Sequence, residues 1–179
     1  MRKAVFLDRD GVINHDLGYV HKWNDFKIFD DLIPFLRKIE ENNILPIIIT
    51  NQSGIARGFY TVKDLQVLME RFDEYLVCNG LSPIKYYFCP HHPDLKSSCS
   101  CRKPKPGLLF QAKKDFNIVL NESILIGDKL TDIECGRRGK LKSTFLMNRT
   151  NKIKNKEING FVNNISNLSE VNLNQLWPQ

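Results

Sequence analysis

The sequence lacks the long apolar segments that a membrane protein needs. None of its apolar runs approaches the roughly 20 residues required to cross a bilayer. No secretory leader is evident either, because Met1-Arg2-Lys3 is followed by only four apolar residues before Asp8. We therefore expect a cytoplasmic protein with no membrane partner.

Motifs of nucleotide-driven and nucleic-acid-binding proteins are also missing. The chain has no P-loop and no kinase-type glycine-rich loop, which argues against a mechanism driven by a nucleotide. The formal net charge is +6, but no arginine-rich arm and no basic stripe interleaved with aromatics occurs. The one modest cluster, Lys152, Lys154 and Lys156, is typical of a solvated loop. We expect no nucleic-acid partner.

Cysteines are few, and three of the five lie close together. Cys89, Cys99 and Cys101 fall within 13 residues, beside His91 and His92. In a reducing compartment such clustering favours a metal over disulfides. A Cys₃His set is typical of a closed, structural zinc site. The spacing alone leaves open whether His91 or His92 completes the set.

Apolar patterns along the 179 residues predict an α/β fold with a mainly parallel sheet. The hydrophobic content of 42% suits one domain, 1–179, with a sizeable core. Strands are expected at residues 4–7, 44–49, 84–88, 122–128, 143–147 and 161–162. Helices are expected at residues 32–39, 65–76, 108–116, 132–138 and 168–177. Because strands and helices alternate, we expect helices on both faces of the sheet.

Helix-end signals support two of these helices. Asp30-Asp31 precedes the first helical pattern, where an aspartate can cap a helix. Thr61 and Asp64 resemble a capping box, and Gly80 suits the position just past a helix end. The two isolated cysteines lie in helix-like segments and are expected to be small core residues: Cys78 and Cys135.

Reactive side chains follow three of the predicted strands. Asp8, Thr50 and Asp128 each stand where an apolar run ends, and ligands bind at the carboxyl ends of such strands. The carboxylates, with Asp10, supply the hard oxygen ligands that Mg²⁺ prefers. Lys103 adds a positive charge, and Thr50 adds a hydroxyl group. Together they indicate a phosphoryl-transfer site.

The pair in "FLDRDGVIN", Asp8 and Asp10, places two carboxylates two residues apart, where each repels the other. A bound Mg²⁺ would offset that repulsion. Asp8 can then attack phosphorus, and Asp10 can supply a proton to the leaving oxygen and later take one from water. This division of roles explains why both carboxylates stand at one strand end.

Four stretches in order, "FLDRDGVI", "IIITNQSG", "CRKPKPG" and "LIGDKLTD", resemble the motifs of haloacid dehalogenase (HAD)-like phosphatases. "DRDGVIN", "GYVH", "TNQSGIARG", "CPHHP" and "CSCRKPKPG" resemble in particular the heptose bisphosphate phosphatase family. The resemblance implies a Rossmann-like three-layer fold with a zinc-binding loop. It also implies Mg²⁺-dependent hydrolysis of a small sugar bisphosphate at C7 through an aspartyl-phosphate, in ADP-heptose and lipopolysaccharide-core precursor synthesis.

The same resemblance assigns the site residues. It implies that Asp8 is the nucleophile, Asp10 the general acid and base, and Thr50 and Lys103 the groups that stabilise the transferring phosphoryl group. The implied Mg²⁺ ligands are Asp8, the Asp10 backbone carbonyl and Asp128, and the implied Zn²⁺ ligands are Cys89, His91, Cys99 and Cys101. The implied substrate contacts are Asp16, Leu17, Gly18, Tyr19, Thr50, Asn51, Gln52, Ser53, Arg102, Lys103 and Lys129.

Two alternative functions remain open at this point. A histidinol-phosphate phosphatase shares the fold and a similar zinc loop, although "GYVH" and "TNQSGIARG" favour the heptose enzyme. A zinc-stabilised nucleic-acid-binding module would explain the Cys/His loop but leaves the polar strand ends unexplained. About 40 residues separate Asp10 from Thr50, too few for a large cap domain of 50 or more residues. We expect an open site on a monomer.

Overall fold

The computed structural model describes residues 1–95, 99–150 and 163–178. The strands are β1 Ala4–Leu7, β2 Leu45–Asn51, β3 Lys85–Cys89, β4 Ile124–Gly127, β5 Ser143–Met147 and β6 Asn163–Ile165. The α-helices are α1 Leu32–Glu41, α2 Val62–Cys78, α3 Gly107–Phe116, α4 Leu130–Arg138 and α5 Leu173–Leu176. Short 3₁₀ helices cover Trp23–Asp25, Leu120–Glu122 and Leu168–Glu170.

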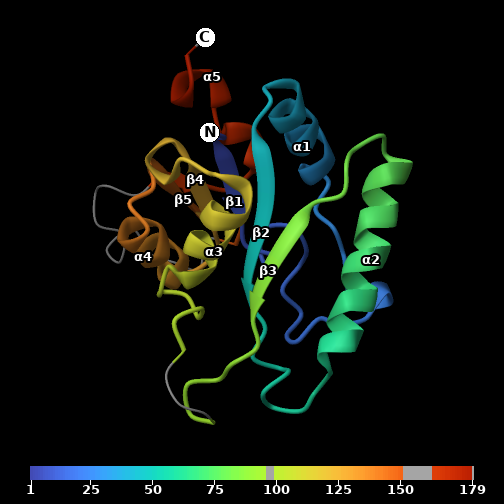
Figure 1. Cartoon of the computed structure of the whole chain (residues 1–179). Coiled ribbons are helices and arrows are strands. Elements are labelled where there is room, and N and C mark those ends of the chain that lie inside the picture. The colour runs from blue at the N-terminus through green and yellow to red at the C-terminus, as the bar shows by residue number, and fades with distance from the viewer. Residues whose placement is uncertain (96–98, 151–162, 179) are drawn as a thin grey trace.

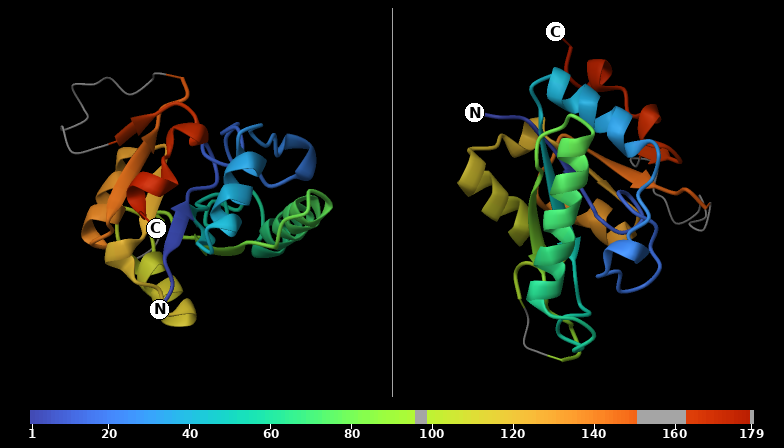
Figure 2. Two further views of the ribbon diagram at one scale, coloured as in Figure 1. Left: turned by 90° about the horizontal axis from the view of Figure 1, so that it is seen from above. Right: turned by 90° about the vertical axis from the view of Figure 1, so that its right-hand side faces the viewer.

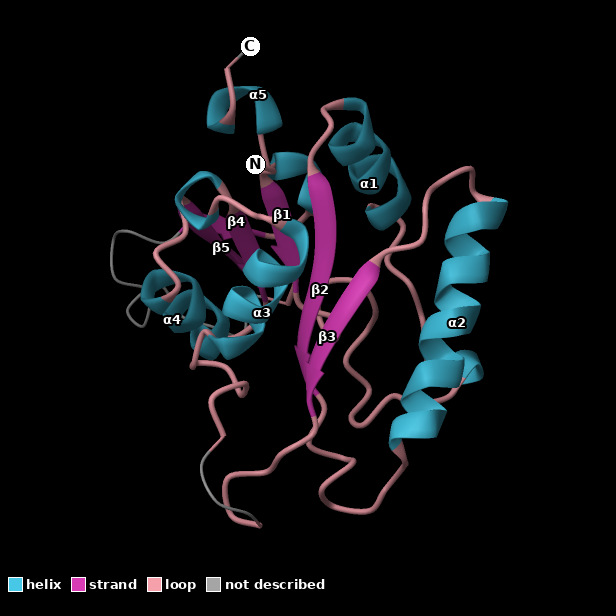
Figure 3. Ribbon diagram, viewed as in Figure 1, coloured by secondary structure: helices cyan, strands magenta, loops and turns pink. Residues whose placement is uncertain are grey.

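The six strands form one sheet in the order β3-β2-β1-β4-β5-β6, and every neighbouring pair is parallel (Figure 1). Helices α1 and α2 cover one face, and α3 and α4 cover the other, so the molecule has three layers (Figures 2 and 3). This is the expected α/β architecture. The strand order reverses beside β1, and such a switch point is where parallel sheets of this kind bind ligands.

Alternation along the strands explains why both faces of the sheet are buried. In β1, Val5 and Leu7 join the core beneath α1 and α2, whereas Ala4 and Phe6 join the core beneath α3. Because helices cover both faces, the strand stays apolar along its length. Cys135 lies in the core beneath α3, as predicted. Cys78 is exposed, so its predicted core position is wrong.

The predicted ends of α2 are confirmed. The Thr61 hydroxyl accepts a hydrogen bond from the Asp64 N–H, and the Asp64 carboxylate accepts one from the Thr61 N–H, which completes the capping box. At the other end, Gly80 has a φ of +74°, a conformation that glycine adopts without steric cost.

The predicted cap of α1 is wrong. Asp31 stands at the right position but makes no capping hydrogen bond with its side chain. Its carboxylate instead accepts two hydrogen bonds of 2.9 Å from Arg149 and one of 2.8 Å from the Leu168 N–H. A long-range ion pair therefore takes the place of the local cap.

The C-terminal segment also differs from the prediction of one closing helix. It forms the 3₁₀ helix Leu168–Glu170 and the four-residue helix α5. The Trp177 Nε1 donates to the Glu122 carbonyl at 2.8 Å, and its ring joins the core, so tertiary contacts shape this tail. Helix α4 begins at Leu130, two residues before the predicted start. The predicted strand 161–162 and the lysine cluster lie outside the described residues.

The described chain carries no cap domain, as predicted. Between β1 and α1 it forms a loop that contains the single 3₁₀ helix Trp23–Asp25. No described helix is both long enough and apolar enough to span a membrane.

Replacing Thr61 with alanine tests the capping box. Thr61→Ala removes the acceptor for the Asp64 N–H and should lower the free energy of unfolding by about 1 kcal/mol. Thr61→Ser keeps a hydroxyl group and should lose much less. Denaturant unfolding of both variants measures the difference, and equal losses would show that the box does not stabilise α2.

Candidate active site

The site lies where β1 and β4 run side by side. Asp8 follows β1, and its N–H donates to the Ile126 carbonyl of β4 at 2.9 Å. Asp128 directly follows β4, and Thr50 lies near the end of β2. Parallel strands end at one edge of the sheet, so the fold brings these three predicted residues to the switch point.

A buried lysine holds two carboxylates together. Lys103 Nζ lies 2.9 Å from Asp8 Oδ1 and 2.6 Å from Asp132 Oδ1, and it donates to the Ile49 carbonyl at 2.9 Å. All three charged side chains are less than one-tenth exposed. Burial alone would lower the pKa of Lys103, but the Asp132 and Asp8 carboxylates raise it above its usual value. Lys103 is therefore held as a cation.

Three carboxylates at this point can hold a metal ion. Oxygen atoms of Asp8, Asp128 and Asp132 lie within 4.8 Å of one another. Burial, and next the Asp8 charge, raise the pKa of Asp128 to about 7. The Asp128 Oδ1 is buried and has no hydrogen-bond partner among the described residues. A hard divalent cation would satisfy that oxygen and offset the repulsion, so these residues fit Mg²⁺.

Gly11 makes room for Asp128. A Cβ atom at Gly11 would lie 2.5 Å from Asp128 Oδ2, and the φ of Gly11 is +85°. Both the close approach and the backbone conformation exclude larger residues. The glycine of "DRDG" thus lets the β4 carboxylate reach the β1 site.

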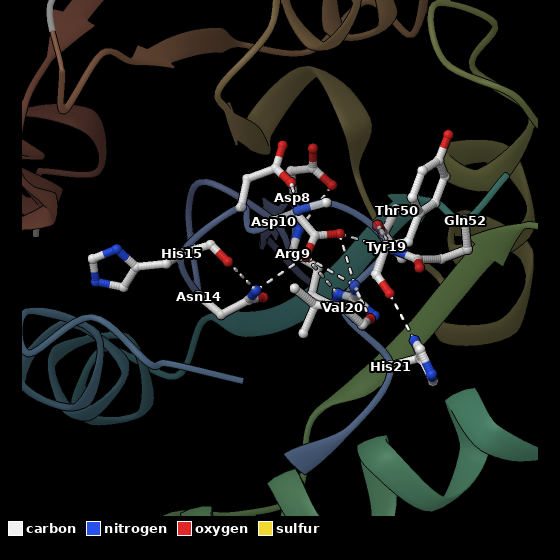
Figure 4. A network of polar contacts seen from close by, with 12 residues as sticks. Asp8, Arg9, Asp10, Asn14, His15, Tyr19, Val20, His21, Thr50 and Gln52 are labelled. Carbon is white, nitrogen blue, oxygen red and sulfur yellow. Dashed lines mark hydrogen bonds and ion pairs between the residues drawn. The ribbon is translucent and has the colours of Figure 1, made fainter. Parts of the chain in front are cut away.

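Asp10 has a different environment from Asp8. The Arg9 guanidinium contacts both Asp10 oxygens, with two distances of 2.8 Å, and the Asn14 amide donates to Asp10 Oδ1 at 3.0 Å (Figure 4). The Gln52 Nε2 donates to Asp10 Oδ2 at 3.1 Å and also to the Thr50 hydroxyl at 2.9 Å. The Asp10 carboxylate is thus fixed by hydrogen bonds from Arg9, Asn14 and Gln52.

Two adjoining cavities border these residues. One, of about 240 Å³, is lined by Asp10, Asp16, Gly18, Tyr19, Asn51, Gln52, Ser53, Tyr60 and Lys129. The other, of about 670 Å³, extends beside the Cys/His loop and includes Arg102 and Lys103 in its lining. Asn51, Ser53 and Lys129 line both cavities, so the two adjoin, and together they are called the cleft below.

The structure brings together most of the predicted substrate contacts along this cleft. Lys129 Nζ lies 3.2 Å from Asp16 Oδ2, so an ion pair joins the turn after β1 to the turn after β4. Leu17 is 61% exposed and lines neither cavity. Gln52 is buried, and its amide contacts other side chains of the protein.

The Cys/His loop forms a second candidate metal centre. The ligand atoms of Cys89, His91, Cys99 and Cys101 all lie within 4.8 Å of one another. His91 Nδ1 is 3.3 Å from Cys101 Sγ and 3.5 Å from Cys89 Sγ. The structure therefore selects His91, a choice that the spacing had left open.

His92 is engaged elsewhere. Its Nε2 accepts a hydrogen bond of 2.6 Å from Arg57 Nη2, because arginine can only donate, and its Nδ1 lies 3.2 Å from the Asp94 backbone nitrogen. With both ring nitrogens occupied, His92 is not available as a ligand.

Sequence reasoning missed Asp132, Arg9 and Tyr60 as parts of the site. Asp132 is the last residue of "LIGDKLTD", and its carboxylate also accepts the Lys129 N–H at the start of α4. The motif placed it near the site, but the contact with Lys103 depends on the fold. Arg9 and Tyr60 carried no signal of their own, because an arginine in a turn and a tyrosine before a helix are ordinary residues.

A parallel sheet of this order, with an aspartate after β1, a lysine from a distant loop and acidic residues after β4, defines a HAD-like hydrolase. A family model described as HAD-hydrolase-like matches residues 100–163. The crystal structure of D,D-heptose 1,7-bisphosphate phosphatase from B. bronchiseptica, complexed with magnesium and phosphate, superposes with a TM-score of 0.82 at 24% identity, over 93% of this chain and 94% of that chain. This likeness shows the shared fold.

Two curated relatives narrow the class. The D-glycero-beta-D-manno-heptose-1,7-bisphosphate 7-phosphatase of Pasteurella multocida is 43% identical over 151 residues, which are 82% of each chain. The D-glycero-alpha-D-manno-heptose-1,7-bisphosphate 7-phosphatase of Photorhabdus laumondii is 43% identical over 150 residues, 81% of this chain and 82% of the relative. The chain belongs to the D-glycero-D-manno-heptose-1,7-bisphosphate 7-phosphatase family of HAD-like phosphatases.

Removing the buried lysine should destabilise the fold as well as the site. Lys103→Ala leaves Asp8 and Asp132 buried without their cation, so the free energy of unfolding should fall by about 3 kcal/mol. Lys129 is also paired with carboxylates but is 54% exposed, and Lys129→Ala should cost less than about 1 kcal/mol. Denaturant unfolding in the presence of EDTA compares the two variants. Equal losses would contradict the central role of Lys103.

Proposed function

We propose that this protein hydrolyses the C7 phosphate of D-glycero-D-manno-heptose 1,7-bisphosphate through an aspartyl-phosphate on Asp8. We place the reaction in the cytoplasm, in the synthesis of ADP-heptose for the lipopolysaccharide core, and expect the enzyme to act as a monomer. The observation that carries the proposal is the buried Asp8 carboxylate, which Lys103 contacts at the switch point of the parallel sheet. The names of the 43% identical relatives support the choice of sugar.

The contacts of Asp8 suit a nucleophile. Its Oδ1 accepts hydrogen bonds from Lys103 Nζ and from the Arg9 N–H at 2.8 Å. One oxygen is thereby fixed, and the other carries no hydrogen bond from the described residues. Lys103 and the Thr50 hydroxyl would stabilise the charge of the transferring phosphoryl group. Asp8, Asp128 and the Asp10 backbone carbonyl would hold Mg²⁺, which offsets the charges of phosphate and carboxylates.

Asp10 would handle the proton. A sugar alkoxide is a poor leaving group, so its oxygen needs a proton as the bond to phosphorus breaks. The Asp10 carboxyl group would donate that proton and then accept one from the water that hydrolyses the aspartyl-phosphate. Its fixed position beside the cleft supports this role.

The cleft suits a substrate with two phosphate groups. Lys103 and Arg102 line its larger part, and Lys129 stands where the two parts join. Positive side chains along the cleft complement the two anionic ends of a sugar bisphosphate. We propose that the turn from Asp16 to Tyr19 and the turn from Thr50 to Ser53 contact the sugar from the smaller part.

Substitution of the two aspartates tests the mechanism. Asp8→Asn should abolish turnover, because an amide cannot attack phosphorus. Asp10→Asn should slow both chemical steps by roughly 10²–10⁴-fold, because it removes the proton transfer. Steady-state kinetics with the α- and β-bisphosphates, beside histidinol phosphate, measures rate and substrate preference together. Normal turnover by a folded Asp8→Asn variant would rule out the covalent mechanism. A preference for histidinol phosphate would show that the proposed substrate is wrong.

We further propose that the Cys/His centre holds a structural Zn²⁺. A tetrahedral site with metal–sulfur distances of about 2.3 Å places its sulfur atoms about 3.8 Å apart. The Cys89 and Cys99 sulfurs are 3.7 Å apart, and the Cys101 and Cys89 sulfurs are 3.2 Å apart. Four protein ligands leave no position for a reacting water. Zn²⁺ would instead hold the loop from which Arg102 and Lys103 extend.

Metal analysis separates the two centres. Cys101→Ser should lose zinc and melt at a lower temperature, with a raised KM and a lowered kcat, yet should still form the aspartyl-phosphate. Cys78→Ser changes an exposed cysteine outside the centre and should keep its zinc. Asp128→Ala should keep zinc but lose the Mg²⁺-dependent recovery of activity after EDTA treatment. Zinc loss from Asp128→Ala, or normal kinetics of zinc-free Cys101→Ser, would contradict this separation.

A further inference from the structure

We propose that Arg9 and Tyr60, acting with Gln52, are positioning residues that hold the Asp10 carboxylate for proton transfer. The inference rests on the proposed phosphatase function. It assigns roles to two side chains that the motifs did not mark, and it gives the Gln52 side chain a role through Asp10.

Arg9 holds the Asp10 carboxylate through its guanidinium group. Its side chain is fully buried, and it contacts both Asp10 oxygens with Nη2 and one with Nε. The same Nη2 donates to the Val20 carbonyl at 2.7 Å, so the guanidinium joins Asp10 to the chain that follows the Asp16–Tyr19 turn (Figure 4). The centroid of the Phe26 ring lies 5.9 Å from the Arg9 guanidinium carbon. A planar, forked cation with several donors suits this place, and an ammonium group does not.

The hydrogen bonds of Gln52 determine which way its amide faces. The Gln52 Nε2 donates to Asp10 Oδ2, so the NH₂ group is the one that faces the carboxylate. That group donates to Thr50 as well. The Gln52 Oε1 then faces the Tyr60 hydroxyl at 2.5 Å, and Tyr60 must donate to it. Tyr60 therefore fixes the amide that links the proton-transfer residue to Thr50.

Tyr60 is itself held in place. Its side chain is 5% exposed, and its ring stacks on His21 with centroids 4.9 Å apart. A Cβ at Gly54 would lie 2.2 Å from the Tyr60 ring, so the glycine leaves the space that the ring occupies. Burial raises the pKa of Tyr60 to about 12, which keeps the hydroxyl protonated as a donor.

Loss of this network should slow the chemical step and leave binding nearly unchanged. Proton transfer needs donor and acceptor within hydrogen-bond distance, and a displacement of about 1 Å can cost on the order of 10²-fold in rate. Tyr60 lines the smaller cavity, but Tyr60→Phe keeps the ring and removes only the hydroxyl, which is bound to Gln52 Oε1, so phosphate and Mg²⁺ binding should persist.

The experiment compares Tyr60→Phe and Arg9→Lys with a matched control. Tyr60→Phe removes only the hydroxyl, and Arg9→Lys keeps the charge but loses the fork. The control is Arg149→Lys, which breaks another largely buried arginine–aspartate pair, Arg149 with Asp31. Arg149 lines neither cavity, and its one contact with the loop after β1 is a 3.3 Å hydrogen bond to the Val12 carbonyl. It should lower stability without lowering kcat.

The readout is the rate of aspartyl-phosphate formation in a single turnover, with the heptose bisphosphate and with p-nitrophenyl phosphate. Only the sugar leaving group needs the Asp10 proton, because nitrophenolate is a stable anion. Both test variants should lose about 10-fold or more with the sugar substrate but less than about threefold with the aryl substrate, at a KM within about twofold. Arg149→Lys should form the aspartyl-phosphate at an unchanged rate with both substrates.

Equal losses with both substrates, or unchanged rates in a folded Tyr60→Phe protein, would overturn the positioning role. Tyr60→Phe keeps the test valid even if Arg9→Lys fails to fold. Asp8→Asn is run beside these variants to distinguish the two proposals. If Asp8→Asn retains turnover, the proposed function fails; if it is inactive while Tyr60→Phe behaves like Arg149→Lys, only the positioning role fails.

Discussion

The rest of the site depends on one buried cation between two buried carboxylates. Lys103 comes from the loop after the Cys/His centre, Asp8 directly follows β1, and Asp132 lies in the first turn of α4. None of the three charges is tolerable alone in the interior, because burial of an unpaired charge is costly. Their contacts therefore tie a loop, a strand and a helix to the same point.

The two aspartates of the "DRD" sequence contact different partners. Asp8 faces Lys103 and the predicted Mg²⁺ ligands, an arrangement that suits a nucleophile. Asp10 faces Arg9, Asn14 and Gln52, which hold its position by hydrogen bonds. Two carboxylates two residues apart thus have different surroundings, and this difference suits the two roles that we propose for them.

The Cys/His centre stands next to the site in the sequence and in space. Cys99 and Arg102 line the same cavity, and the Arg102 guanidinium donates to the His91 carbonyl at 3.0 Å. Arg102 and Lys103 follow the last cysteine directly, so a metal that fixes Cys101 also restricts both cations. The loop sequence contains few apolar residues, which is consistent with the structural metal that we propose for it.

The sequence by itself determined the features that depend on nearby residues. The apolar runs predicted strands β1 to β5, the Thr61–Asp64 pair predicted the start of α2, and the ordered motifs predicted the residues that gather at the strand ends. Side chains whose partners lie far along the chain could not be predicted in this way. Only the tertiary structure placed Asp132 against Lys103.

The same limit applies to choices between neighbouring residues. Spacing could not separate His91 from His92, because both stand beside the cysteines; the choice depends on Arg57, which contacts His92 from another loop. Local preference predicted that Asp31 caps α1, but Arg149, 118 residues away, binds its carboxylate instead. Gln52 is oriented by Tyr60 and Asp10, from opposite sides. Hydrogen bonds and ion pairs between segments that are distant in the sequence decide these positions, because their partners are brought together only by the tertiary structure.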